Sequence, residues 1–368
     1  MKYCCTYCNK CWNHPVEKCI FCGNEITQIK ETQYKVVGFS EVFIPSTGNE
    51  KVPYYVNILE DGKGDKIIKK SFEKYEIGDT IDLMEDKKTD MTIGVIGTGL
   101  MGIQIASYLI QYHYPTTVKT RAEENASVIL SRIQKQISKR LTQDQMKKSL
   151  KNLHITTKYE DLAHCDIIIE AVIEDLKIKK EIFNNLSKIC GPSTIFASNS
   201  SSLSIDDLSI ASNRPEKCIG MHFFNPVHRM DLVEVVVGKS TSETTINTIK
   251  NLVIKLNKRP IVVKNSPGYV VNRLLLPQIN EAIHLFENGV ASKEDIDNAT
   301  KLGLNHPMGP FELADFIGLD ICLSILEVLH RELHDPHYKP AKLLYDLVNQ
   351  RKLGFKSGEG FYLYGKVG

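Results

Sequence analysis

The chain has 368 residues, which exceeds one ordinary domain and predicts two or three compact units. Apolar residues make up 42% and charged residues 24%, as in a globular chain with a sizeable core, and no run reaches the roughly 18 apolar residues that a membrane helix needs. The formal net charge is +2, which excludes a strong overall field for attracting a polyanion.

The first residues, MKYCCTYCNK, are polar and rich in cysteine where a signal peptide needs an apolar core, so we expect a cytoplasmic protein. Six of the ten cysteines lie within the first 22 residues. In a reducing compartment this clustering favours metal binding over disulfides. Two C-x-x-C pairs can supply four thiolates to a tetrahedral Zn²⁺. Residues 1–30 are therefore predicted to form a zinc ribbon with one structural zinc, held by Cys5, Cys8, Cys19 and Cys22, with Cys11 as the alternative ligand.

Residues 31–88 contain short runs rich in β-branched and aromatic residues, namely YKVVGFSEVFI, PYYVNILE, KIIKKSF and IGDTIDL. Strands at this spacing predict a small antiparallel barrel of the OB type. Such a barrel can bind single-stranded nucleic acid, but thirteen Lys, no Arg and fifteen Asp or Glu give residues 1–90 a net charge of −2. That sign is wrong for a groove that follows a phosphate backbone, so we expect no nucleic-acid partner.

From residue 91 the pattern changes to alternating apolar-strand and helix-period segments, which indicates an α/β domain of the Rossmann type over residues 91–265. Beyond Asn265-Ser266-Pro267-Gly268 the segments are almost wholly helical. We therefore expect a multi-domain chain: zinc ribbon, small β-barrel, Rossmann-type domain, and an all-α C-terminal domain over residues 266–368.

Gly97, Gly99 and Gly102 form a G-x-G-x-x-G motif that follows a short apolar run and opens an amphipathic helix. Gly97 permits a tight turn, Gly99 lets the backbone approach a pyrophosphate, and Gly102 allows close helix packing. The helix N-terminus adds amides and a positive dipole end, with Leu100 and Met101 in the same loop. This context predicts a dinucleotide site.

The second strand of such a domain usually ends in an acid that binds the adenosine ribose. Here the chain reads TTVKTRAEE, and Thr120 and Arg121 stand in its place. A guanidinium can bind a 2′-phosphate that an acid would repel, so the sequence favours NADP over NAD. The alternative is that Arg121 is solvated and that the cofactor is NAD.

Seven stretches of residues 91–364 resemble the 3-hydroxyacyl-CoA dehydrogenase family, including its short-chain 3-hydroxybutyryl-CoA members. They are VIGTGLMG, IIIEAVIED, FASNSSSLSI, GMHFFNPVHRMDLVEVV, NSPGYVVNRLLLP, HPMGPFELADFIGLD and KSGEGFYLY. In this resemblance His222 looks like the catalytic base and Glu234 like its acidic partner. Ser201, Asn272 and Asn225 look like the polar groups that hold the substrate.

The same resemblance implies further ligand contacts. Glu174, Lys179 and Asn199 look like cofactor contacts, and Lys139 falls where the family has a lysine near the CoA phosphates. The implied reaction is reversible oxidation of (S)-3-hydroxyacyl-CoA to 3-oxoacyl-CoA, with a short acyl chain. The resemblance also implies a homodimer formed by the helical domain, and the apolar segments 269–286 and 311–329 favour it.

The chemistry supports these roles independently. Oxidation of a secondary alcohol requires hydride to leave carbon while a base takes the hydroxyl proton, and a neutral imidazole such as that of His222 suits this work near neutral pH. Glu234 would fix its tautomer and stabilise the imidazolium. Ser201 and Asn272 can donate to the substrate oxygen. The alternative, a histidine buried in an apolar core, does not explain the order Ser, His, Glu, Asn.

The first 90 residues lie outside the dehydrogenase pattern. They resemble the acyl-CoA-associated zinc-ribbon and OB-fold proteins that accompany thiolases, which implies a docking module for a thiolase or another acyl-CoA enzyme. Two alternative functions remain for the whole chain. One is a dehydrogenase of small free hydroxy acids, and the other is a cofactor-binding scaffold with an acyl-CoA accessory domain.

Overall fold

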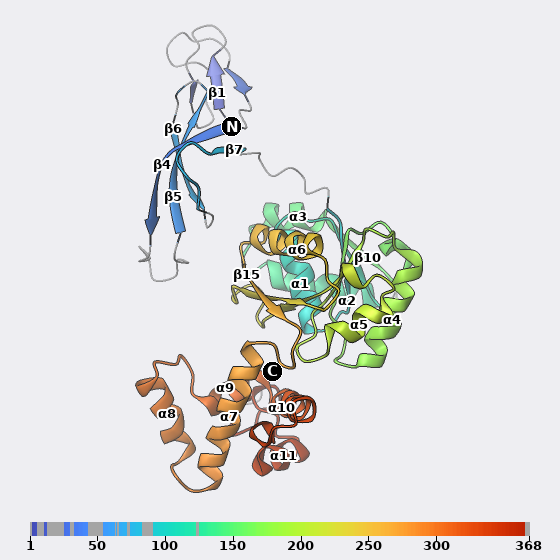
Figure 1. Ribbon diagram of the computed structural model, residues 1–368, viewed down its shortest axis with the longest axis vertical. Coiled ribbons are helices and arrows are strands. Elements are labelled where there is room, and N and C mark those ends of the chain that lie inside the picture. The colour runs from blue at the N-terminus through green and yellow to red at the C-terminus, as the bar shows by residue number, and fades with distance from the viewer. Residues whose placement is uncertain are drawn as a thin grey trace. The chain divides into compact units, whose positions relative to one another are not determined.

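The computed structural model describes residues 2–5, 11–12, 26–29, 33–42, 54–62, 64, 66–71, 74–82, 91–122 and 125–364. The chain divides into two compact units, Met1–Lys88 and Thr89–Gly368, shown in Figure 1. Among the described residues no helix is long and apolar enough to cross a membrane.

The first unit contains two antiparallel sheets. The smaller has the order β2-β1-β3, and the larger has the order β6-β5-β4-β7 around a small core of Tyr34, Val36 and Leu59. The larger sheet is open in the part of the chain that the structure describes, so the expected barrel closure is not seen there. The strands are β1 (Lys2–Cys5), β2 (Cys11–Trp12), β3 (Ile26–Ile29), β4 (Gln33–Val42), β5 (Tyr54–Asp61), β6 (Lys66–Ser71) and β7 (Thr80–Asp82).

Three of the five candidate zinc ligands lie outside the described residues. The backbone places Cys5 at the end of β1 and Cys11 at the start of β2, where Cys11 pairs with Cys4 across the sheet. Cys8, Cys19 and Cys22 are not among the described residues. The zinc ribbon therefore stays a prediction.

The second unit begins with an eight-stranded sheet of order β10-β9-β8-β11-β12-β13-β14-β15. Neighbouring strands are parallel except β13 and β14, which are antiparallel. This confirms the predicted Rossmann-type domain. The strands are β8 (Ile93–Ile96), β9 (Thr116–Lys119), β10 (Leu153–Thr156), β11 (Ile167–Glu170), β12 (Ile195–Ser198), β13 (Cys218–Phe223), β14 (Leu232–Val237) and β15 (Arg259–Lys264).

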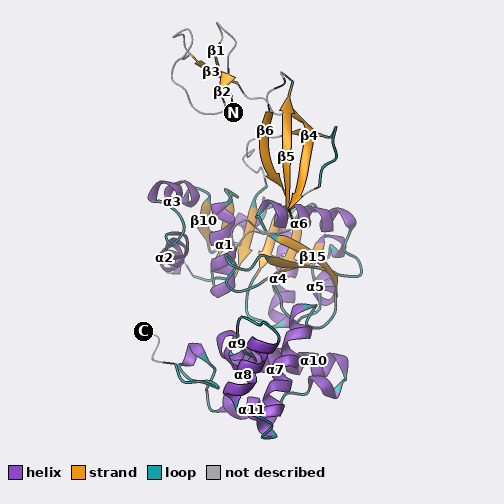
Figure 2. Ribbon diagram, turned by 90° about the vertical axis from the view of Figure 1, so that its left-hand side faces the viewer, coloured by secondary structure: helices purple, strands orange, loops and turns teal. Residues whose placement is uncertain are grey.

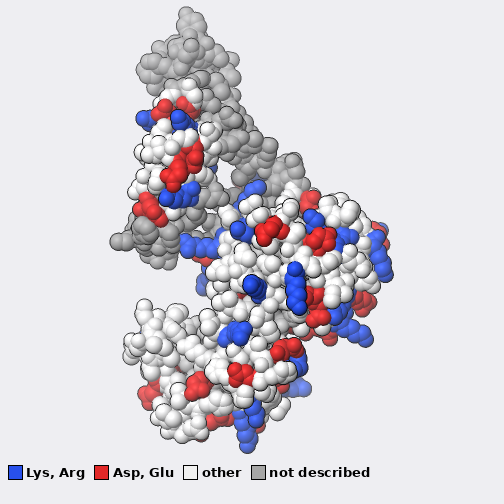
Figure 3. All heavy atoms as spheres, in the orientation of Figure 1, with Lys and Arg blue, Asp and Glu red and all other residues white. Residues whose placement is uncertain are grey.

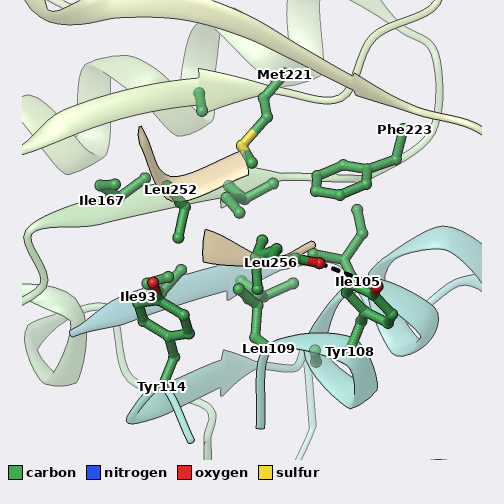
Figure 4. Close-up of a cluster of buried hydrophobic side chains, with 14 of the residues drawn as sticks. Ile93, Ile105, Tyr108, Leu109, Tyr114, Ile167, Met221, Phe223, Leu252 and Leu256 are labelled. Carbon is green, nitrogen blue, oxygen red and sulfur yellow. Dashed lines mark hydrogen bonds between the residues drawn. The ribbon is translucent and has the colours of Figure 1, made fainter. Parts of the chain in front are cut away.

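Helices cover both faces of this sheet, as Figure 2 shows. Because side chains alternate along a strand, Ile167 and Ile169 enter one core while Ile168 enters the other. The first core joins the sheet to α1, α2 and α6, and Figure 4 shows Tyr108 of α1 bonded to the carbonyl of Leu256. The second joins it to α4 and α5. The helices are α1 (Leu100–Gln111), α2 (Ala126–Ile137), α3 (Gln143–Leu150), α4 (Leu176–Ile189), α5 (Ile205–Ala211) and α6 (Glu243–Lys255), with 3₁₀ turns at Glu160–Leu162 and Pro215–Lys217.

The remaining residues form the predicted helical domain around a third core, which includes Phe311, Leu319 and Leu326. These three side chains are fully buried within the domain, whereas Phe316 and Ile321 of the same segment 311–329 are exposed. The helices are α7 (Val271–Glu287), α8 (Lys293–Gly303), α9 (Pro310–Ile317), α10 (Leu319–Leu333) and α11 (Lys342–Asn349), with 3₁₀ turns at Pro336–Tyr338 and Phe355–Ser357.

Charged side chains of both signs are interspersed over the face of the second unit visible in Figure 3. That face therefore presents no large patch of one sign, in keeping with a net charge near zero.

Candidate active site

The turn from β8 into α1 requires glycine at two positions, one in the loop and one in the first turn of the helix. Gly97 has φ +113°, and a Cβ there would overlap the backbone of Ala171. A Cβ on Gly102 would overlap the carbonyl oxygen of Gly97. Gly99 precedes α1 without a side-chain cap, and the space beside its Cα is open. The amides that begin α1 are thus available to an anion, which is the arrangement that a dinucleotide pyrophosphate requires.

Residues Thr120 and Arg121 follow the carboxyl end of β9, next to this loop. The amide of Thr120 donates to the carbonyl of Thr156 at 2.8 Å, and its buried hydroxyl has no partner among the described atoms. Arg121 is exposed. Burial, and then the charge of Arg121, lower the pKa of Lys119, whose ammonium lies 4.2 Å from the ring centroid of Tyr159. Two cations therefore lie close together where the ribose acid is usually found.

A buried charge network lies at the carboxyl end of β11. The ammonium of Lys179, 1% exposed, binds Glu170 at 2.9 Å and Glu174 at 3.1 Å. Burial alone would lower the pKa of Lys179, but the two carboxylates outweigh it and raise that pKa. Burial alone would raise the pKa of Glu174, but the charge of Lys179 and the hydroxyl of Ser200 outweigh it and lower that pKa. In the structure Lys179 thus contacts two carboxylates, and its expected contact with the cofactor stays a prediction.

Glu174 also organises the serine loop that follows β12. One oxygen of Glu174 accepts hydrogen bonds from the amides of Ser201 at 2.9 Å and Ser202 at 3.1 Å, and from the hydroxyl of Ser200 at 2.5 Å. Ser198 donates to Glu170 at 2.6 Å. The charge network therefore fixes the backbone that carries Ser201, one of the expected substrate contacts.

His222 and Glu234 face each other across the antiparallel pair β13–β14, where they are direct register partners. His222 Nδ1 lies 2.7 Å from Glu234 Oε2, and the two residues are 6% and 1% exposed. The second oxygen of Glu234 accepts from the amides of Val270 at 3.1 Å and Val271 at 3.0 Å. The carboxylate is fully hydrogen-bonded, and it requires Nδ1 of the imidazole to carry the proton.

The start of the helical domain completes this region. Asn272 Nδ2 donates to the carbonyl of Ser201 at 3.3 Å, which joins two of the expected substrate contacts. Tyr269 lies with its ring centroid 5.6 Å from that of His222, and its hydroxyl donates to the carbonyl of Leu203 at 3.1 Å. Burial raises the pKa of Tyr269, which keeps its hydroxyl protonated.

The remaining expected residues occupy different places. Asn199 follows β12, and its side-chain oxygen accepts from the amide of Phe223 at 2.8 Å. Asn225 is exposed just beyond β13. Leu100 and Met101 open α1, and Lys139 lies in the exposed turn after α2. The structure thus gathers most of these residues at the carboxyl ends of β8, β11, β12 and β13, where ligands bind in sheets of this kind.

Two family models match the second unit. The one described as "3-hydroxyacyl-CoA dehydrogenase, NAD binding domain" matches residues 92–266, and the one described as "3-hydroxyacyl-CoA dehydrogenase, C-terminal domain" matches residues 268–364. The chain belongs to the 3-hydroxyacyl-CoA dehydrogenase family. It is accordingly an oxidoreductase that acts on CH–OH groups and uses NAD(H).

Relatives in this dehydrogenase family match the same part of the chain. The chain is 45% identical to a 3-hydroxybutyryl-CoA dehydrogenase of Clostridioides difficile over 281 residues, which is 75% of this chain and 100% of that protein. It is 40% identical to the human mitochondrial hydroxyacyl-coenzyme A dehydrogenase, covering 74% of this chain and 90% of that one. The solved (S)-3-hydroxybutyryl-CoA dehydrogenase PaaH1 from Ralstonia eutropha superposes with a TM-score of 0.71 at 42% identity, covering 75% and 99%.

Sequence reasoning missed two residues that the dehydrogenase structure brings into this region. Glu170 ends the apolar run DIIIE, and a charge at the end of a buried strand is the signal that could have revealed it. Gln104, in the second turn of α1, bonds to the loop beyond β13. No local pattern marks Gln104, because its partners lie more than 120 residues further along the chain.

We expect the Lys179→Met variant to lose about 3–5 kcal/mol of unfolding free energy, because Glu170 would be left buried without its cation. The matched control is Lys180→Met. Its side chain is 39% exposed and its ammonium lies 3.3 Å from Asp207, so the loss should be about 1 kcal/mol or less. Urea unfolding measures both values, and equal losses would contradict the proposed importance of the buried network.

The pH dependence of this contribution follows from the two pKa shifts. Because the pKa of Glu174 is lowered in the folded state, its contribution is present above its usual value of 4.5 and is lost as the pH falls through the folded value. Because the pKa of Lys179 is raised, its contribution is fully present below 10.5 and is lost as the pH rises through the folded value. The difference in unfolding free energy between Lys179→Met and Lys180→Met should therefore be constant around neutral pH and shrink in acid.

Proposed function

We propose that this enzyme interconverts (S)-3-hydroxyacyl-CoA and 3-oxoacyl-CoA, with a short acyl chain such as that of 3-hydroxybutyryl-CoA. The observation that carries the proposal is the buried His222–Glu234 pair at 2.7 Å, which lies at the carboxyl end of a parallel strand in a dinucleotide-binding sheet. The short chain is supported by the names of relatives that are 45% and 42% identical.

His222 is the proposed proton acceptor. Its Nδ1–H is held by Glu234, so the lone pair of Nε2 is the group that takes the proton of the substrate hydroxyl during oxidation. The charge of Glu234 stabilises the imidazolium that results. A bound nicotinamide would accept the hydride from the carbon that carries this hydroxyl, and in the reverse direction it would donate a hydride to that carbon.

Ser201 and Asn272 are the proposed donors to the substrate oxygen. The contact between Asn272 Nδ2 and the carbonyl of Ser201 keeps the two residues adjacent, and Glu174 holds the Ser201 amide. Donors fixed before the substrate arrives stabilise oxygen charge without reorganisation during the reaction. Glu174 and Lys179 are proposed to serve the site chiefly through this loop, and Asn199 through the end of β13.

A basic cluster supports the proposed position of the CoA phosphates. Burial, and then nearby cations, lower the pKa of His228, which follows β13. These cations are Arg140, Arg229 and the expected phosphate contact Lys139, together with Lys258, which is buried and bound to backbone carbonyls. Several cations beside one loop favour a polyanionic substrate, which a small free hydroxy acid would not need.

His222→Ala should lower kcat for acetoacetyl-CoA reduction by about 10²-fold or more, the usual scale for lost acid–base catalysis, with the fold retained. His164→Ala is the control, since His164 is exposed before β11, at the opposite end of the sheet. The same assay with free acetoacetate separates the alternative functions. Activity on the free acid alone would overturn the CoA substrate, and activity on neither would favour a scaffold.

We also propose a preference for NADP(H) within the NAD-binding family. The support is the exposed Arg121 and its neighbour Lys119 at the end of β9. The hydroxyl of Thr120 is buried, so the proposal depends on Arg121.

Steady-state comparison of NADPH with NADH should favour NADPH by about tenfold to a hundredfold in kcat/KM, as expected for a charge-assisted contact of about 1.5–3 kcal/mol. Arg121→Gln should remove most of this preference, and Thr120→Asp with Arg121→Gln should reverse it. A wild-type enzyme that prefers NADH would show that Arg121 does not bind a phosphate.

For residues 1–88 we propose a zinc ribbon and OB-like module that docks a thiolase or another acyl-CoA enzyme in the cytoplasm. The support is the paired cysteines, the two antiparallel sheets, and four buried free thiols in the second unit, which suit a reducing compartment.

For the second unit we propose a homodimer. Its support is a set of exposed apolar side chains in the helical domain, namely Val270, Leu274, Phe316 and Ile321.

Deletion of residues 1–88 should leave a folded, active dimer, because the three cores of the second unit use described residues from Met91 onward. The full chain should carry one zinc ion and the deletion variant none, by elemental analysis. Light scattering should give a dimer for both, and only the full chain should co-elute with a thiolase. An insoluble or inactive variant, a monomer at micromolar concentration, or a zinc-free full chain would each contradict its part of the proposal.

A further inference from the structure

Gln104 connects the cofactor helix to the loop that follows the proposed base. It lies two residues after Gly102 in α1 and is 7% exposed. Its Oε1 accepts from the amide of Val227 at 2.7 Å, and its Nε2 donates to Asn225 Oδ1 at 2.9 Å. Both partners lie just beyond β13, which carries His222.

These two contacts fix the orientation of two amide groups. The partner at Val227 is a backbone N–H, which can only donate, so the oxygen of Gln104 must face it. The nitrogen of Gln104 must then face Asn225, whose oxygen must accept. The NH₂ group of Asn225 is left as a donor at the exposed end of its side chain.

The loop is anchored independently on its other side. The ammonium of Lys258, 4% exposed, binds the carbonyls of Val227 at 2.5 Å and Met230 at 2.7 Å. Both backbone polar groups of Val227 are thus bonded. Since Lys258 still holds the Val227 carbonyl when Gln104 is changed, the orientation of the Asn225 amide is the property that depends most on Gln104.

We propose that Gln104 is a positioning residue that turns the Asn225 amide so that its NH₂ donates to a carbonyl oxygen of the bound substrate or cofactor. The inference rests on the proposed function, because it assumes that the ligand lies at the carboxyl end of β13 beside His222. The acceptor is a carbonyl of the acyl-CoA or the carboxamide of the nicotinamide. A rise in KM for acetoacetyl-CoA in the Asn225→Ala variant would identify the acyl-CoA carbonyl as the acceptor, and a rise in KM for the dinucleotide would identify the nicotinamide carboxamide.

The test is a double-mutant cycle with Gln104→Met and Asn225→Ala. Gln104→Met keeps the shape of the side chain, but it releases the Asn225 amide and removes the acceptor of the Val227 amide, while Lys258 still holds the loop. It should lower kcat/KM by about tenfold. In the Asn225→Ala background it should lower kcat/KM by no more than about twofold, because there is no amide left to orient. A purely structural role would give the same loss in both backgrounds.

A second variant and a control sharpen the result. In the Gln104→Glu variant the new carboxylate still accepts from the Val227 amide, but its other oxygen can only accept, so the Asn225 NH₂ must turn toward it and the Asn225 oxygen outward. The loss of kcat/KM in Gln104→Glu should therefore exceed that in Gln104→Met. Gln111→Met, on the same helix, removes only a bond to the Ser107 carbonyl and should match wild type.

Equal losses in both backgrounds, or no loss from Gln104→Met in the wild-type background, would overturn the inference while leaving the proposed function intact. Wild-type enzyme without acetoacetyl-CoA activity would overturn the proposed function, and this inference with it.

Discussion

A carboxylate that is 1% exposed, as in Glu234, needs donors on both oxygens, because an unpaired buried charge costs several kcal/mol. One oxygen binds His222 on the neighbouring strand, and the other binds two amides at the start of α7. The satisfied carboxylate therefore requires that the sheet and the helical domain are docked. The orientation of the imidazole depends on a contact between two domains as well as on its own strand.

The charge network of Glu170, Lys179 and Glu174 follows the same logic one strand away. Each charge is offset by the others, and the remaining oxygen capacity is used by serine hydroxyls and amides. A network of this kind is stable only when every member is in place. The conformation of the loop at Ser201 therefore depends on the packing of α4 against β11, because Lys179 of α4 holds Glu174 and Glu174 binds the Ser201 amide.

Much of the site could be predicted because the motifs carry the chemistry locally. The glycine spacing implies the loop geometry, and the family pattern identifies His222 and Glu234. The spacing of twelve residues could not show that they face each other, because this depends on β13 and β14 being antiparallel in a largely parallel sheet. Gln104 could not be predicted, since its partners are brought to it only by tertiary packing. The buried hydroxyl of Thr120 also reflects packing, not the strand pattern.

The reversal of strand direction after β13 has a consequence for how such enzymes diverge. Residues 224–231 join β13 to β14, and outside the anchored Asn225, Val227 and Met230 this connection can change as long as the buried faces of the two strands keep their register. A single insertion within β14 before Glu234 would instead turn the carboxylate to the other face of the sheet. Mutation can therefore reshape the connection while the proton-transfer pair is inherited unchanged. The topology thus separates the connection, whose length can change, from the β13–β14 pair, whose register cannot.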